Sequence, residues 1–166
     1  MLNINIVKFF PDEISEVINK YFEEDEEEKN KGLEEIRLRV DRPIILKFNK
    51  FEKVLDYIVT TENILKTLQY VCDNSVYTYQ NQICDGFITV RGGHRIGVTG
   101  NCAIENNRVT NINYISSLNF RVAKEIRGVS NKVLKYVLNI EDNSIYTTLI
   151  VSPPGVRKNY SSKRFS

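Results

Sequence analysis

The amino-acid sequence predicts an α/β fold of the α+β type: a mostly antiparallel sheet built of hairpins, together with three to four helices. Two kinds of pattern support this class. Strand-forming runs flank turn residues at 41–43 and at Gly92-Gly93, and apolar side chains recur with helical spacing in 11–22 and 61–71. The 42% hydrophobic content is ordinary for a globular protein, and 166 residues suffice for one domain with a real core.

The composition also indicates the cellular compartment in which the protein is expected. No run of about 18 apolar residues occurs, so no transmembrane helix is expected, and the first residues lack the pattern of a secretion signal. The three cysteines match no metal-ligand spacing. We interpret them as reduced thiols that pack as small hydrophobic side chains in a cytoplasmic protein. The last ten residues carry four basic side chains and no acid, and without them the net charge falls from +2 to −2.

The first element is a predicted helix at residues 11–22. Pro11 suits the first turn, and Asp12 and Glu13 suit the positive end of the helix dipole. The apolar side chains that share one face are Ile14, Val17, Ile18, Tyr21 and Phe22. We interpret the charged run at 23–31 that follows as a solvated helix end and loop.

A hairpin is predicted over residues 33–48, with its turn at 41–43, because apolar and polar side chains alternate in the first strand. Arg37 and Arg39 lie on the polar face of that strand. There they either meet solvent or line a groove for anions. Residues 54–59 are predicted to form a third, short strand.

Two helical stretches follow. Thr60 or Thr61 is expected to cap a helix whose apolar stripe consists of Ile64, Leu65, Leu68 and Val71. A second stretch, 75–84, is expected to end at Gly86, which suits a left-handed stop. The tyrosines here are expected to pack rather than to stack on bases: Tyr70, Tyr77 and Tyr79.

The centre of the sequence is a predicted hairpin over residues 87–101, with a two-residue turn at Gly92-Gly93, since glycine adopts positive φ at no steric cost. The expected cross-strand pairs are Arg91 with His94, Thr89 with Ile96, and Phe87 with Val98. Three basic-type side chains then lie at or near the tip: Arg91, His94 and Arg95. His94 has no identifiable Ser or Cys nucleophile, so the sequence does not indicate a hydrolase triad.

Further strands complete the predicted sheet. A turn at Asn106-Asn107 and an interruption at Ser116-Ser117 divide residues 87–123 into a meander of four antiparallel strands. A last helix is expected at 130–138. A final strand, apolar enough to be buried, is expected at 146–151.

The final strand leads into the beginning of a phosphate-binding loop, formed by Ser152, Pro153, Pro154 and Gly155. Such a loop continues with Gly-Lys-Ser/Thr, whose lysine reaches the phosphates and whose hydroxyl binds Mg²⁺. Lys158 is in register, but Arg157 and Asn159 occupy the glycine and hydroxyl positions. Codons can be chosen for these residues that, shifted by one base, encode Gly-Lys-Thr-Thr-Leu-Leu-Arg-Asp. We therefore interpret residues 157–166 as an out-of-frame tail that replaces an ATPase domain.

Three motifs in this order resemble one family: GFITVRGGHRIGVTGN, ISSLNFRVAKEIRG and TLIVSPPGV. Between residues 33 and 156 the chain resembles the stage III sporulation protein AA family, which consists of sporulation ATPases similar to the ring-forming motors of secretion and pilus systems. The resemblance implies the N-terminal portion of such an ATPase, truncated within the phosphate-binding loop. Its parts are an N-terminal α+β domain at 1–140, and a linker with the first strand of the missing domain at 141–156.

The implied function is assembly and regulation of a motor at the channel between mother cell and forespore. The intact family member is expected to bind ATP and Mg²⁺, to form a hexamer, and to lie in the mother-cell cytoplasm against membrane-channel proteins. This chain is expected to bind neither cofactor, and its ATPase activity stays open. The resemblance implies a phosphate-facing or ring-interface role for Arg95, Arg121 and Arg127, beside the remnant loop residues 152–155 and Lys158.

Two other functions fit parts of the sequence. Residues 97–100 match the GxxG of KH domains, and a basic stripe is available for single-stranded nucleic acid, formed by Arg37, Arg39, Arg91 and Arg95. Against this, a KH GxxG joins two helices, whereas here it lies within a strand pattern, so binding of nucleic acid is not expected. A purely structural oligomerisation domain differs from the first function only in whether Arg95 or Arg121 contacts nucleotide.

Overall fold

The computed structural model describes residues 6–24, 32–123, 136–139, 142 and 144–148. The chain divides into two units, Met1–Ala123 and Lys124–Ser166.

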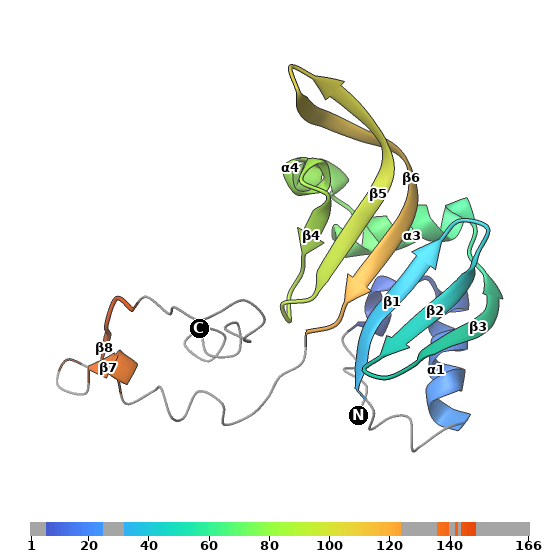
Figure 1. Ribbon diagram of the computed structural model, residues 1–166, viewed down its shortest axis with the longest axis horizontal. Helices are drawn as coiled ribbons and strands as arrows, with labels where there is room; N and C mark the ends of the chain where they lie inside the picture. Colours follow the sequence, from blue (N-terminus) through green and yellow to red (C-terminus); the bar gives the residue numbers. More distant parts are fainter. Residues whose placement is uncertain (1–5, 25–31, 124–135, 140–141, 143, 149–166) are drawn as a thin grey trace. The chain divides into compact units, whose positions relative to one another are not determined.

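A six-stranded sheet in the first unit has the strand order β3-β2-β1-β6-β5-β4 (Figure 1). Every neighbouring pair is antiparallel. The strands are β1 (Leu33–Arg39), β2 (Pro43–Phe48), β3 (Glu52–Ile58), β4 (Phe87–Thr89), β5 (Arg95–Glu105) and β6 (Arg108–Arg121). The predicted α+β class is therefore confirmed.

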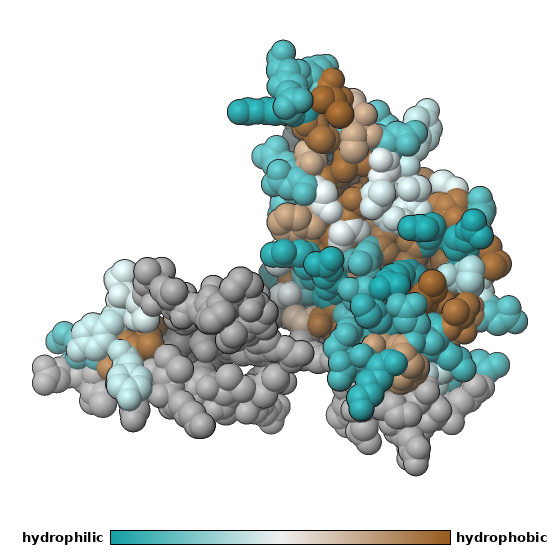
Figure 2. All heavy atoms as spheres, in the orientation of Figure 1, coloured by the Kyte–Doolittle hydropathy of each residue, from teal (hydrophilic) through white to brown (hydrophobic). Residues whose placement is uncertain are grey.

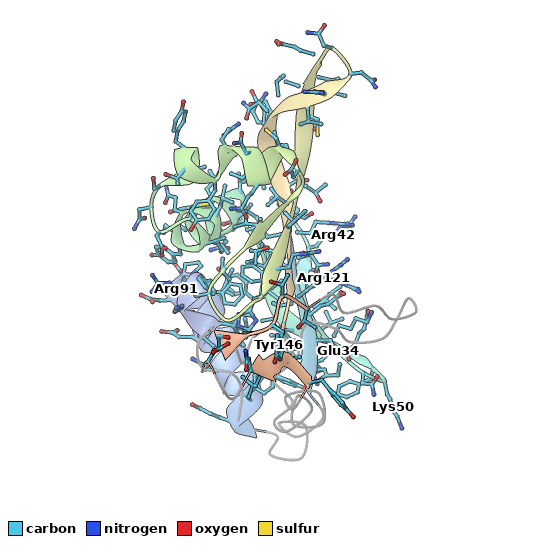
Figure 3. The ribbon with its side chains drawn as sticks, turned by 90° about the vertical axis from the view of Figure 1, so that its left-hand side faces the viewer. Glu34, Arg42, Lys50, Arg91, Arg121 and Tyr146 are labelled. Carbon is cyan, nitrogen blue, oxygen red and sulfur yellow. The ribbon has the colours of Figure 1, made fainter. Side chains whose placement is uncertain are left out.

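Helices cover one face of this sheet (Figures 1 and 3). The chain passes from β3 at one edge to β4 at the other edge through three of these elements. The helical elements are η1 (Val7–Phe9), α1 (Asp12–Glu24), α3 (Thr61–Val71), η2 (Val76–Tyr79) and α4 (Gln80–Cys84). The opposite face of the sheet remains uncovered by any of them.

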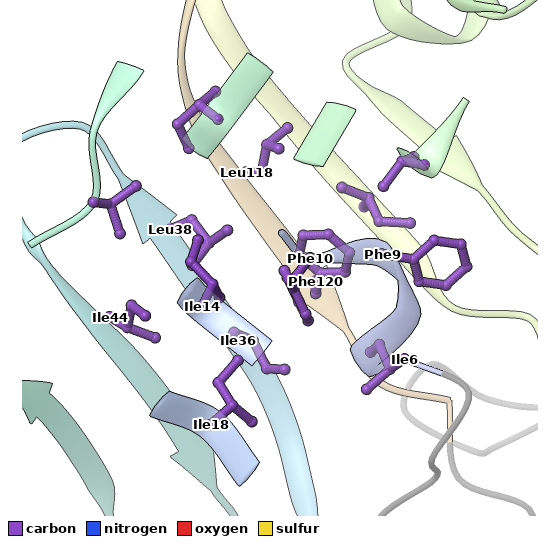
Figure 4. Close-up of a cluster of buried hydrophobic side chains, with 14 of the residues drawn as sticks. Ile6, Phe9, Phe10, Ile14, Ile18, Ile36, Leu38, Ile44, Leu118 and Phe120 are labelled. Carbon is purple, nitrogen blue, oxygen red and sulfur yellow. The ribbon is translucent and has the colours of Figure 1, made fainter. Parts of the chain in front are cut away.

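The core lies between the sheet and the helices (Figure 4). Phe120 of β6 lies at its centre: the ring centroid is 4.6 Å from that of Phe10 and 6.5 Å from that of Phe9. Ile14 and Ile18 of α1 are fully buried, as the helical spacing predicts. Because these side chains anchor η1 and α1 on one face, the polar positions of the strands face outward.

The cap of α3 is Thr60. The Asn63 N–H donates to Thr60 Oγ1 at 3.1 Å, and the Thr60 N–H donates to Asn63 Oδ1 at 3.0 Å, which is a reciprocal capping box. Ile64 and Leu68 are buried as predicted. Leu65 is 48% exposed, so its predicted place in the buried stripe is wrong.

The central hairpin forms at the predicted place, but the predicted register is wrong by one residue. Ile88 pairs with Ile96, and the Val90 N–H donates to the His94 carbonyl at 3.0 Å, so the loop contains three residues rather than two. A shift of one residue exchanges the faces of a strand. His94 is consequently fully buried instead of lying at the tip.

The predicted four-stranded meander is also incorrect, because β6 is a single strand that passes through Ser116-Ser117. The irregularity lies just before these residues. Tyr114 has φ of +47°, and the β5–β6 register shifts between Thr99 and Asn101. The turn at Asn106-Asn107 is as predicted, with both residues at positive φ.

In the second unit, β7 (Leu138–Asn139) pairs with β8 (Ser144–Ile145). Leu138, predicted as the end of a helix, thus lies in a strand. Residues 146–148 are not in a strand, contrary to the predicted start of the final strand. Residues 136–137 are helical, as predicted, whereas residues 130–135 and 149–151 lie outside the described residues.

The cysteines differ in their surroundings. Cys72 is buried, and burial raises the pKa of its thiol to about 11, with the charge of Asp73 adding to the effect. Cys84 is half-buried and Cys102 is exposed, so the packing interpretation is wrong for Cys102. No helix in the part of the chain that the structure describes is long and apolar enough to cross a membrane.

Candidate functional site

Arg95 and Arg121 are brought together by the sheet. Arg95 is the first residue of β5 and Arg121 the last residue of β6, and the two are direct cross-strand partners. Figure 3 shows the sheet nearly edge-on, with helices on one side and Arg121 on the other. The Arg121 side chain is 66% exposed. Two of the three arginines that the sequence singled out therefore form one exposed pair.

Glu35 continues this row on the other side of Arg121. The two residues are cross-strand partners, but Arg121 Nε is 3.9 Å from Glu35 Oε1, which is a long contact. Arg37 holds Glu35 more closely: its Nη2 and Nε lie 3.0 and 3.1 Å from Glu35 Oε2. Glu35 is thus mainly the partner of Arg37 and offsets only part of the positive charge of the arginine pair.

Arg37 is a structural ion-pair residue. Its Nη1 also donates to Glu52 Oε1 at 2.9 Å. Burial acts to lower the pKa of Arg37, but the hydrogen bond to Glu35 and the charges of Glu52 and Glu35 outweigh it, so the pKa is raised. Arg37 therefore connects β1 to β3 through ion pairs. Its guanidinium group is already paired with two carboxylates, which argues against the interpretation that it lines a groove for anions.

Arg95 rests on an aromatic ring. Its guanidinium carbon lies 4.4 Å from the centroid of Phe87, a cation–π contact that restricts the side chain to one side of β5. No carboxylate contacts Arg95 within the ranges that the structure describes. Arg95 and Arg121 are thus two like charges directly opposite each other, and a bound anion would reduce their mutual repulsion.

The next row of the same face consists of Gly97, Asn119 and Arg37. Gly97 pairs with Asn119, and a Cβ at Gly97 would meet only Asn119 atoms, at 3.8 Å. Asn119 Oδ1 is enclosed and has no hydrogen-bond partner among the described residues. Figure 2 shows the face, with hydrophilic residues gathered over β1 and the adjoining ends of β5 and β6.

His94 lies beneath this row, and sequence reasoning missed its role. Its Nδ1 accepts the N–H of Ala123 at 3.0 Å. A signal that could have placed His94 inside is the alternation of apolar residues on both sides of the turn. Ile88 in β4 and Val90 just after it precede the turn, and Ile96 in β5 follows it, so a three-residue loop places His94 on the same buried face.

The remaining predicted site residues lie outside the described residues: Arg127, Ser152, Pro153, Pro154, Gly155 and Lys158. The KH-like alternative is not supported, because residues 97–100 lie inside β5 rather than between two helices. No group of three His, Cys, Asp or Glu side chains suited to a metal occurs in the stretches that the structure describes. The exposed arginine pair has the chemistry that suits an anion such as phosphate.

Comparisons with known proteins show the family of the chain. The family described as "Sporulation stage III, protein AA" matches residues 7–161. Stage III sporulation protein AA of Bacillus subtilis (strain 168) is 34% identical over 126 residues, which are 76% of this chain and 40% of that protein. Among solved structures, the VirB11 ATPase from the Brucella suis type IV secretion system, in complex with sulphate, matches with a TM-score of 0.35 and 11% identity. That match covers 72% of this chain and 36% of the other.

Proposed function

Because this chain belongs to the sporulation stage III protein AA family, we propose that it is the assembly and regulatory head of a ring-forming motor ATPase. The chain spans 40% of the length of its Bacillus subtilis relative. ATP hydrolysis, with its Mg²⁺, is accordingly proposed for the complete protein. Its proposed partners are further copies of itself in a hexamer and the membrane-channel proteins between mother cell and forespore.

The head's own contribution is to direct Arg95 and Arg121 toward the nucleotide phosphates. The observation that carries this proposal is their direct pairing on the uncovered face of the sheet. A guanidinium group is planar, always charged and suited to two parallel hydrogen bonds with phosphate oxygens. Two of them on neighbouring strands match the several oxygens of a polyphosphate. Arg127, residues 152–155 and Lys158 are proposed to lie on the chain's path to the same phosphates.

We expect the head to bind inorganic triphosphate, measured by isothermal titration calorimetry at low salt. Arg95→Ala and Arg121→Ala should each raise the Kd roughly tenfold, because a hydrogen bond to a charged group contributes about 1.5 kcal/mol or more. Glu35→Gln should lower the Kd, since it removes the nearest negative charge. Affinity should fall as salt rises.

Arg108→Ala is the matched control, because Arg108 is an exposed arginine at the far end of the same strand. It should leave the Kd unchanged. Equal weakening by Arg95→Ala, Arg121→Ala and Arg108→Ala would mean that general positive charge, not this pair, attracts the anion. A head that assembles normally but shows no dependence on Arg95 or Arg121 would instead support the purely structural oligomerisation function.

A further inference from the structure

We propose that His94 is a positioning residue that fixes the path by which the chain leaves the head, by accepting the backbone N–H of Ala123 at its Nδ1. The distance is 3.0 Å, and Ala123 is the last residue of the first unit. This role does not depend on what Arg95 and Arg121 bind.

Sheet pairing ends before this point. β6 stops at Arg121, whose partners are Glu35 and Arg95. The Val122 N–H donates to the Glu34 carbonyl at 2.8 Å, and the next N–H, that of Ala123, goes to the His94 side chain. The two residues that follow β6 are thus held from both sides, one by β1 and one by the β4–β5 loop.

The loop in turn fixes the imidazole. His94 is fully buried, and the Gly93 N–H donates to the Val90 carbonyl at 3.0 Å. Gly92 has φ of +88°, and a Cβ there would lie 2.9 Å from His94 Nε2, so only glycine lets the loop lie against the ring. A ring enclosed in this way presents Nδ1 in one direction, which is what a positioning residue requires.

The hydrogen bond also determines the state of the imidazole. A neutral imidazole accepts at one nitrogen and donates at the other, whereas the imidazolium only donates. Acceptance at Nδ1 therefore places the proton on Nε2. Since His94 precedes Arg95 and Ala123 follows Arg121 by two residues, this one bond lies next to the arginine pair at the end of the first unit.

Two substitutions of similar polarity separate positioning from mere packing. His94→Asn retains an acceptor at the δ position, while His94→Gln moves it to the ε position, away from Ala123. Amide hydrogen exchange, measured by NMR on the whole chain, should show Ala123 protected in the wild type and in His94→Asn. In His94→Gln the Ala123 amide should exchange roughly five- to tenfold faster relative to Phe120, because one hydrogen bond is lost. Equal protection of Ala123 in both variants would overturn the proposal.

If either variant fails to fold, NMR of the wild-type protein alone can test whether His94 Nδ1 accepts the Ala123 N–H. With ¹⁵N-labelled protein, the Nδ1 signal should be that of an unprotonated ring nitrogen, with a scalar coupling across the hydrogen bond to the Ala123 amide nitrogen. A protonated Nδ1, or the absence of that coupling, would overturn the proposal. Neither readout involves phosphate, so failure here and failure of the proposed phosphate contact are separate results.

Discussion

Phe120→Ala is expected to lower the free energy of unfolding by about 3–5 kcal/mol, the range for removing a buried aromatic ring from a packed core. Phe120 is fully buried, its backbone pairs with Ile36 of β1 and Ile96 of β5, and its ring contacts Phe10. It therefore joins the two halves of the sheet to the helical layer. Urea denaturation followed by circular dichroism measures the loss.

Phe120→Leu is the control, because it keeps an apolar side chain at the position and removes less volume. Phe120→Leu should lower the free energy of unfolding clearly less than Phe120→Ala does. The comparison of the two Phe120 variants also tests the direction of the neighbouring Arg121 side chain. Arg121 adjoins Phe120 on the strand, so its outward direction follows from the inward direction of the phenyl ring. A loss below about 1 kcal/mol for Phe120→Ala would contradict the assigned face of β6.

Gly100→Ala should lower the free energy of unfolding by about 1–3 kcal/mol, the usual range for forcing extra volume into a packed site. A Cβ at Gly100 would lie 2.7 Å from the Asn113 carbonyl oxygen, 2.8 Å from Ile112 Cγ2 and 2.9 Å from Ile115 Cα. Two of these atoms are backbone and cannot rotate away. The crowding arises because β6 bulges at Tyr114 directly opposite this glycine. The same denaturation assay applies.

Gly97→Ala provides the comparison three residues earlier on β5. The nearest atoms to its added Cβ lie at 3.8 Å, which is ordinary contact. It should leave stability nearly unchanged or raise it slightly, because alanine restricts the unfolded chain more than glycine does. If Gly97→Ala and Gly100→Ala proved equally mild, the bulge in β6 would be incorrectly placed.

Local patterns were sufficient to predict most elements. The β1–β2 hairpin and α3 follow from alternation, turn residues and a cap that lie within a few positions of one another. The one-residue error at Gly92-Gly93 arose because two glycines permit either a two- or a three-residue loop. Burial of His94, a long-range effect, decides between them. The bulge at Tyr114 had no local signal either, since it depends on what lies across the sheet.

The site was predictable only in part. The family resemblance pointed to Arg95 and Arg121, and the family is confirmed. Their pairing was not foreseen, because it depends on the register of β5 against β6 and on a sheet order that places β6 beside β1. The same order places Glu35 opposite Arg121 and Arg37 opposite Asn119 in the next row. Contacts between strands so far apart in sequence leave no periodic trace in the chain.

ATP turnover by a complete protein is the measurement that shows whether the arginine pair contacts nucleotide phosphates. This chain can replace the matching part of the Bacillus subtilis relative, with assembly checked by size-exclusion chromatography. Arg95→Ala combined with Arg121→Ala should lower kcat about 100-fold or more while rings still form, as expected when charge stabilisation of the transferred phosphoryl group is removed. Unchanged turnover in intact rings, equal to that of an Arg108→Ala protein, would mean that the pair makes no functional contact with the phosphates.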